Sequence, residues 1–67
     1  MTPTWHVIVE GHYVGSVHED TEDAARCAAL QHFAVSEEEF EEMDTRERND
    51  VRDFRIPPGA EFHVSRA

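Results

Sequence analysis

The sequence contains no lysine, only one cysteine and no long run of apolar residues. Because Cys27 has no second cysteine to pair with, packing alone must stabilise the fold, as is usual in a reducing compartment. No segment approaches the roughly 20 apolar residues that a membrane span needs. Residues 1–9 also lack the basic segment and apolar run of a signal peptide. We therefore expect a soluble, cytoplasmic protein.

The 67 residues leave room for one domain only, residues 1–67, near the lower limit of what a single hydrophobic core stabilises. Low hydrophobicity with high net charge is also the composition of disordered chains. The apolar residues, however, follow strand and helix periods, and Trp5, Tyr13 and four phenylalanines are available to fill a core. We therefore predict a folded domain.

The formal net charge of the whole chain is −9, and acidic residues dominate its first two-thirds. Residues 1–45 hold eleven acids against Arg26 alone, whereas residues 46–67 hold four acids against five arginines. Such a charge distribution repels nucleic acids and anionic membranes and attracts basic protein surfaces. A basic protein is the expected partner.

Period-two alternation from residue 4 to residue 18 predicts a β-hairpin. A three-residue loop at residues 10–12 pairs Val9 with Tyr13 and Trp5 with Val17, which places every odd residue on one face. A two-residue loop would shift the register and mix the faces. The three-residue loop is therefore the prediction.

Residues 21–34 predict a helix, with Asp20 or Thr21 as its N-cap and two acids in its first turn. Its expected apolar stripe, which faces the hairpin, consists of Cys27, Leu30 and Phe33, with Ala24 and Ala34 at the margins. Ser36 and Glu39 then form a capping box that begins a second, short helix. This helix is expected to stop or bend near Asp44.

The C-terminal segment predicts a second hairpin, with strands around Phe54 and Ile56 and around Phe62 and Val64, separated by the turn at residues 57–59. The expected fold class is α+β: a small antiparallel sheet of two hairpins with one or two helices packed on one face. The element order is ββααββ or ββαββ.

Five histidines invite a metal hypothesis, and His6, His12 and His18 share the even face of the first hairpin with Glu10. The chain has no CxxC or HxxxH spacing, so we predict no metal site. It also has no phosphate-binding loop or cofactor motif, and Cys27 lies in an apolar stripe where thiols are usually inert. We predict a protein that is not an enzyme and has no cofactor.

The segment Glu37 to Glu42 carries five carboxylates in six positions. On a helix, Phe40 and Met43 form one face and the acids form the opposite arc. Like charges four residues apart destabilise a helix by about 0.2–0.5 kcal/mol per pair. Five charges over roughly 9 Å of helix axis match the roughly five phosphates on the same length of duplex DNA.

In size, acidity, absence of lysine and compact α+β layout, the whole chain resembles the small anti-CRISPR proteins of bacteriophages and mobile elements, several of which are DNA mimics. The resemblance implies a bacterial host cell and an inhibitor that occupies the basic surface where a CRISPR effector reads its protospacer-adjacent motif. The acidic face predicted to bind this partner consists of Glu37, Glu38, Glu39, Glu41, Glu42 and Asp44, extended by Glu22 and Asp23 with their neighbours Glu19 and Asp20.

An alternative function is a non-enzymatic interaction module that binds through a sheet edge or through the even sheet face. That face would expose Ile8 and Val14 if helices cover only the other face. The same residues would be buried in a homodimer, which a small core would favour.

Overall fold

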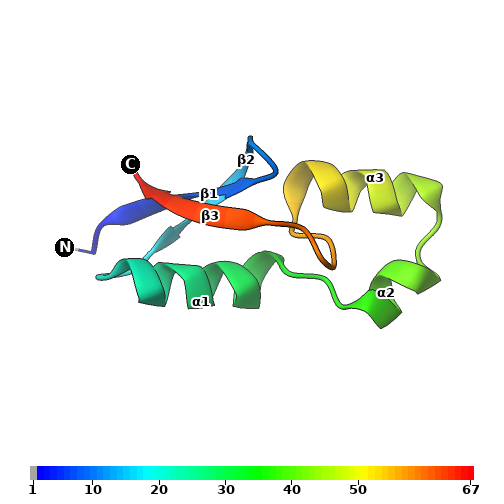
Figure 1. Ribbon diagram of the computed structural model, residues 1–67, viewed down its shortest axis with the longest axis horizontal. Helices are drawn as coiled ribbons and strands as arrows, with labels where there is room; N and C mark the ends of the chain where they lie inside the picture. Colours follow the sequence, from blue (N-terminus) through cyan, green and yellow to red (C-terminus); the bar gives the residue numbers. More distant parts are fainter. Residues whose placement is uncertain (1) are drawn as a thin grey trace.

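The computed structural model describes residues 2–67 as a three-stranded sheet with three helices. The order along the chain is β1 (Thr4–Val9), β2 (His12–His18), α1 (Glu22–Phe33), α2 (Glu37–Glu42), α3 (Thr45–Phe54) and β3 (Phe62–Arg66). The sheet is antiparallel with strand order β2-β1-β3. Helix α1 lies along one side of the sheet, and α2 and α3 lie toward the end opposite the chain termini (Figure 1). The predicted α+β class with an antiparallel sheet is confirmed.

The first hairpin has a two-residue turn instead of the predicted three-residue loop. Glu10 and Gly11 both have positive φ, 50° and 85°, and Val9 pairs with His12 and not with Tyr13. Two consecutive positive φ values give the turn the backbone twist that suits a tight hairpin. The predicted loop was therefore one residue too long.

A β-bulge restores the register further along the hairpin. Val7 pairs with Gly15 and Ile8 with Tyr13, so Val14 is the additional residue on β2. Beyond the bulge Trp5 pairs with Val17, as predicted. The bulge turns the Tyr13 side chain away from the core, so that it is 56% exposed. Val14 packs against the core instead. The predicted faces of Tyr13 and Val14 were therefore both wrong.

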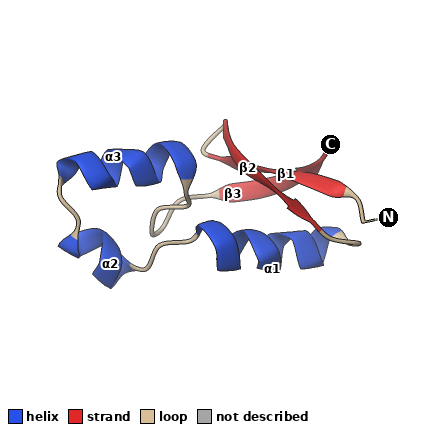
Figure 2. Cartoon of the chain, turned by 180° about the vertical axis from the view of Figure 1, so that it is seen from behind, coloured by secondary structure: helices blue, strands red, loops and turns tan. Residues whose placement is uncertain are grey.

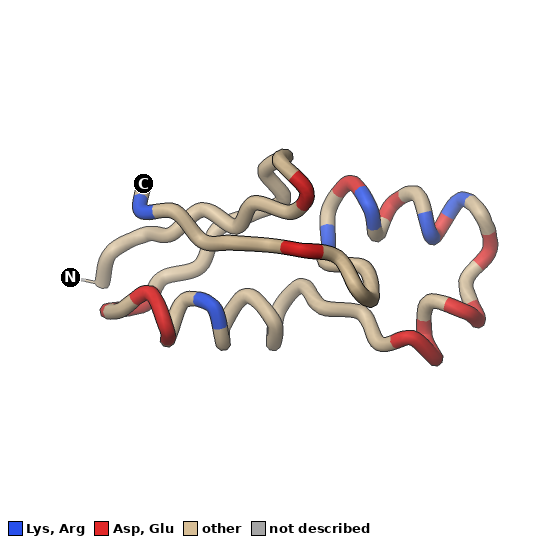
Figure 3. Tube along the Cα trace, viewed as in Figure 1, with Lys and Arg blue, Asp and Glu red and all other residues tan. Residues whose placement is uncertain are grey.

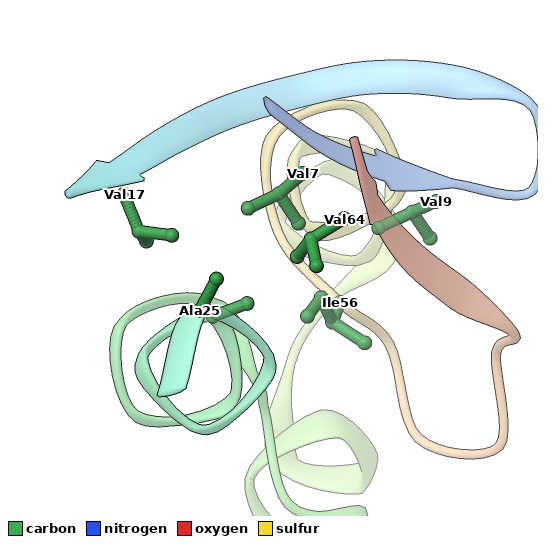
Figure 4. Packing of buried hydrophobic residues seen from close by; sticks show 7 residues of the cluster. Val7, Val9, Val17, Ala25, Ile56 and Val64 are labelled. Carbon is green, nitrogen blue, oxygen red and sulfur yellow. The ribbon is translucent and has the colours of Figure 1, made fainter. Parts of the chain in front are cut away.

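The core lies between the sheet and α1. Val7, Val9, Val17 and Val64 of the sheet meet Ala25 and Ala29 of α1, together with Ile56 (Figure 4). Helix α1 begins after its N-cap Thr21, whose hydroxyl accepts a hydrogen bond from the Ala24 N–H. The predicted helix and one of its two predicted caps are thus confirmed.

The predicted apolar stripe of α1 was wrong in two of its three main members. Cys27 is exposed and Leu30 is 47% exposed, whereas Ala25 and Ala29 are fully buried. Small side chains at these positions let the helix approach the valine-covered sheet closely. Of the predicted stripe, Phe33 and the marginal Ala34 pack on the core.

Gly15 explains how Phe33 fits under the sheet. A Cβ built on Gly15 would lie 2.7 Å from Cε1 of the Phe33 ring, which is closer than real contacts allow. The ring therefore occupies the space that a side chain at residue 15 would need. This contact fixes the position of α1 against β2.

Residues 36–55, named here the helical arm, leave the core after Val35 and return to it at Ile56, and α3 also contacts β2 and has Val51 buried. The Val35 N–H donates to the Ile56 carbonyl at 3.0 Å, and the Ile56 N–H donates to the Phe33 carbonyl at 2.9 Å. Val35 and Ile56 are both buried. These two hydrogen bonds, named here the clasp, close the base of the arm.

The second predicted hairpin does not form, because residues 45–54 are the helix α3 and only Phe62–Arg66 is a strand. Phe54, predicted to face the core, is 63% exposed. Asp44 instead caps α3 by accepting a hydrogen bond from the Glu47 N–H at 2.9 Å. Among residues 2–67, no helix has the length and apolar character required to cross a membrane.

Candidate protein-binding surface on the helical arm

Helix α2 presents its acidic side chains to solvent. Ser36 caps the helix by accepting from the Glu39 N–H at 3.2 Å, and its own hydroxyl donates to the Glu39 carboxylate at 3.3 Å. The bond from the Glu39 N–H is the first of the two bonds of the predicted capping box, whereas the Glu39 carboxylate meets the Ser36 hydroxyl in place of its main-chain N–H. All five glutamates of the helix are exposed, and Phe40 alone turns inward, where it is half-buried.

Arginines of α3 hold α2 in place through its main chain and its aromatic ring. Arg48 donates from Nε to the Phe40 carbonyl at 3.0 Å and from Nη2 to the Glu41 carbonyl at 2.9 Å. The guanidinium carbons of Arg48 and Arg52 lie 5.4 and 5.9 Å from the centre of the Phe40 ring. A cation at these carbonyls also complements the negative end of the helix dipole.

This arrangement leaves the predicted binding carboxylates with different structural roles. Asp44 and Glu39 take part in the caps of α3 and α2. Within residues 2–67, the other four carboxylates of α2 accept no hydrogen bond from a side chain or cap. These four, named here the α2 carboxylates, are Glu37, Glu38, Glu41 and Glu42.

The predicted helical arc is shorter than expected. Helix α2 ends at Glu42, Met43 is its C-cap, and a new helix begins after Asp44. Met43 and Asp44 therefore do not continue the pattern of a single helix. The bend near Asp44 was predicted, but the α3 helix that follows it was not.

The acidic residues form two separate groups. Glu22 and Asp23 lie in the first turn of α1, whereas α2 follows its other end. Helix α1 has twelve residues and is about 18 Å long, and the two groups lie at its first turn and beyond its last. Figure 3 shows the two acidic groups at opposite ends of α1. The predicted extension of the α2 surface by Glu22 and Asp23 is therefore not continuous.

The helical arm carries more than half of the net charge. Its nine acids and four arginines give a formal charge of −5, out of −9 for the chain. The arginines lie on α3 and beside it, and two of them face Phe40. The outer side of α2 therefore remains uniformly anionic.

His6 and His18 lie on the sheet, apart from this surface. His6 packs edge-on against Tyr13 with ring centres 5.2 Å apart, and the His18 Nδ1 lies 3.0 Å from the Thr4 hydroxyl. Both belong to the sheet face that α1 does not cover, together with half-buried Ile8. No group of three His, Cys, Asp or Glu side chains suited to a metal ion occurs within residues 2–67.

The sequence interpretation missed the arginine contacts to Phe40 and the cap at Asp44. The second of these had a signal, since Asp44 followed by Glu47 has the spacing of a capping box. The arginine contacts had none, because they depend on how α2 and α3 fold back on each other.

Comparison of the chain with models of known protein families, with curated proteins and with solved structures finds no significant match.

Proposed function

We propose that this protein is an inhibitor that binds a basic nucleic-acid-binding surface of another protein and competes there with DNA. The α2 carboxylates make the central contact. The observation that carries this proposal is that four exposed carboxylates stand together on a short helix whose caps and packing use none of them. An anti-CRISPR that blocks target DNA binding is the particular form proposed.

The energetics of α2 support selection for binding over stability. The pairs Glu37 with Glu41 and Glu38 with Glu42 are like charges four residues apart. Each pair destabilises the helix by about 0.2–0.5 kcal/mol. A six-residue helix has little intrinsic stability of its own. The repulsion is therefore retained in an element poorly able to tolerate it, which a role in binding explains.

The charge density of α2 suits a groove that holds DNA. The five glutamates occupy roughly 9 Å of helix axis, a length on which duplex DNA carries about five phosphates. CRISPR effectors hold nucleic acid in positively charged channels and read the adjacent motif with arginines. Such a surface would attract α2 over a distance limited by ionic screening.

A competition measurement tests the proposal. A purified CRISPR effector complex is incubated with labelled target DNA and increasing amounts of this protein at several salt concentrations. We expect displacement of DNA that weakens as salt is added. The variant Glu38→Gln/Glu42→Gln should displace DNA about thirtyfold less well or worse, since each of the two lost contacts to a charged group is worth about 1 kcal/mol or more.

The control variant is Glu22→Gln/Asp23→Asn, which removes the same charge from the distant acidic group. It should compete like the unmodified protein. Circular dichroism of both variants verifies folding. Equal loss in the two variants would mean that total charge, and not the α2 surface, determines binding. Absence of displacement from a panel of such effectors would reject the proposed target class.

A further inference from the structure

A groove separates strand β2 from helix α1, away from the helical arm. Its volume is about 410 Å³, and its lining includes Val17, Ala28 and Phe33 with Glu19 and His32. The apolar residues come from both elements, and Glu19 lies in the connection between them. Strand β2 runs toward the beginning of α1 (Figure 2), and Glu19 of the connection between them lines the groove. It is a mainly apolar channel with an acidic residue in its lining.

One side of the groove is the open edge of the sheet. Strand β2 is an edge strand because the strand order is β2-β1-β3. The Ser16 hydroxyl lies 2.8 Å from the Tyr13 hydroxyl, and His18 contacts Thr4, so both side chains belong to the opposite sheet face. What Ser16 and His18 contribute to the groove is therefore the main chain of the strand, with hydrogen-bonding groups that a further strand would satisfy.

Strand β2 lacks most of the devices that protect edge strands. It contains no proline and no charged residue. The bulge at Val14 interrupts the edge near the turn, which leaves a regular segment at residues 15–18. The other edge, β3, carries Arg66. The β2 edge is therefore the one suited to accepting a short extended segment.

The charges around the groove select the type of segment. Glu19 lines it, and Glu22 and Asp23 follow at the start of α1. The main chain of Glu19 is fixed in place, because the Trp5 Nε1 donates to the Glu19 carbonyl at 2.9 Å. These carboxylates favour a cationic side chain, whereas a second copy of this chain would bring a further net charge of −9.

We infer that an extended, basic segment of a partner protein adds to the β2 edge as a further strand. Its main chain pairs with residues 15–18. Every second side chain of the segment faces the groove, where a small apolar one packs against Val17, Ala28 and Phe33. A basic side chain of the segment lies beside Glu19. This site is separate from the α2 carboxylates and does not depend on their proposed role.

The test uses nuclear magnetic resonance with a defined probe. The probe is a hexapeptide of alternating valine and threonine with one arginine at either its first or its last position. We expect it to shift the amide signals of residues 15–18 and of Ala28 and to slow amide exchange along β2. Two further peptides carry backbone N-methyl groups, one on its odd residues and the other on its even residues. At least one of the two should not bind, since its methylated nitrogens cannot donate hydrogen bonds to β2.

Matched substitutions on α1 locate the site. Ala28→Arg places a long cationic side chain in the groove and should weaken binding about tenfold. Gln31→Arg adds the same charge at an exposed position of the same helix that does not line the groove, and should bind like the unmodified protein. Glu19→Gln should weaken binding of the arginine peptide more than binding of a peptide without arginine.

Several results would overturn the inference. One is absence of shifts at about 1 mM peptide. A second is shifts confined to α2, and a third is equal binding by all N-methylated peptides. Self-association through β2 without peptide would replace the partner segment by a second copy. If Ala28→Arg does not fold, the N-methylated peptides and Glu19→Gln still decide the matter.

Discussion

Gly15 and Phe33 show how a single missing side chain fixes the position of a helix. The Phe33 ring occupies the space beside β2 where any other residue at position 15 would place its Cβ. The backbone of Gly15 has no unusual φ, so the requirement is one of space and not of conformation. The packing of α1 on the sheet therefore depends on this contact.

Gly15→Ala should lower the free energy of unfolding by about 1–3 kcal/mol, the usual effect of overpacking a core. The new methyl group would overlap the Phe33 ring, whose Cε1 lies 2.7 Å from the built Cβ. Urea denaturation followed by Trp5 fluorescence measures the change. In a Phe33→Leu background the same substitution should have a smaller effect, because the smaller side chain makes room. Additive effects of the two substitutions would show that the ring does not limit this site.

Individual residues of α1 also show why part of the core was not predictable. The sequence indicated the helix and its Thr21 cap, because these signals are local. It did not indicate that Ala25 and Ala29 face the sheet in place of Cys27 and Leu30. That choice depends on the distance between helix and sheet, which is set by valines and Gly15 elsewhere in the chain.

At the scale of elements, the helical arm holds α2 by very few contacts. Helix α2 has no buried residue, and Arg48 connects its last carbonyls to α3. An element held in this way opens more easily than the sheet and its helix. The fixed shape of the acidic surface therefore depends on Arg48.

Arg48→Met should release α2 while leaving the sheet intact. Methionine retains an apolar stem near Phe40 but loses the two hydrogen bonds to the carbonyls, each worth about 1 kcal/mol. We expect faster amide exchange in α2 and no change in β1. Arg48→Lys retains the charge but not the two-donor geometry, so it should restore only part of the protection. Unchanged exchange in α2 would mean that Arg48 does not hold it.

Helix α3 was not predicted, because the sequence of this segment carries two conflicting patterns. Phe54 and Ile56, followed by two prolines, have the alternation of a strand. Asp44 and Glu47 have the spacing of a helix cap, and only Val51 of the helix is buried. The segment forms the helix that the capping signal indicates, and Phe54 at its end faces solvent. The acidic stretch and its capping box were predictable, because both are contiguous in sequence.

At low salt, the electrostatic field of each charge extends over most of the molecule. Its Cα extents are 39 × 19 × 17 Å, and its formal net charge is −9. At about 0.01 M salt the screening length is about 30 Å, so most of the fifteen acids repel one another, and the six arginines offset only part of this repulsion. Self-repulsion of this kind destabilises a compact chain.

Stability and partner binding should therefore respond to salt in opposite directions. Raising sodium chloride from about 0.01 M to about 1 M shortens the screening length to about 3 Å and should raise the melting temperature. The same change should weaken binding to a basic partner through α2. Thermal denaturation and the DNA competition, measured over one salt series, check both. A melting temperature that falls with salt would mean that attractive charge pairs outweigh the repulsion.

The clasp at Val35 and Ile56 has a consequence for how this chain can change over time. Because hydrogen bonds join residues 33–35 to Ile56, the two ends of the helical arm enter and leave the core side by side. Closing a loop of a different length across the same two ends changes the free energy only slowly with its length. Only the part of the arm around α2 can therefore be lengthened, shortened or exchanged with little effect on the strands and α1, because α3 also contacts β2 and has Val51 buried. The architecture thus separates a scaffold, formed by the sheet and α1, from a segment around α2 whose length and sequence the scaffold constrains less.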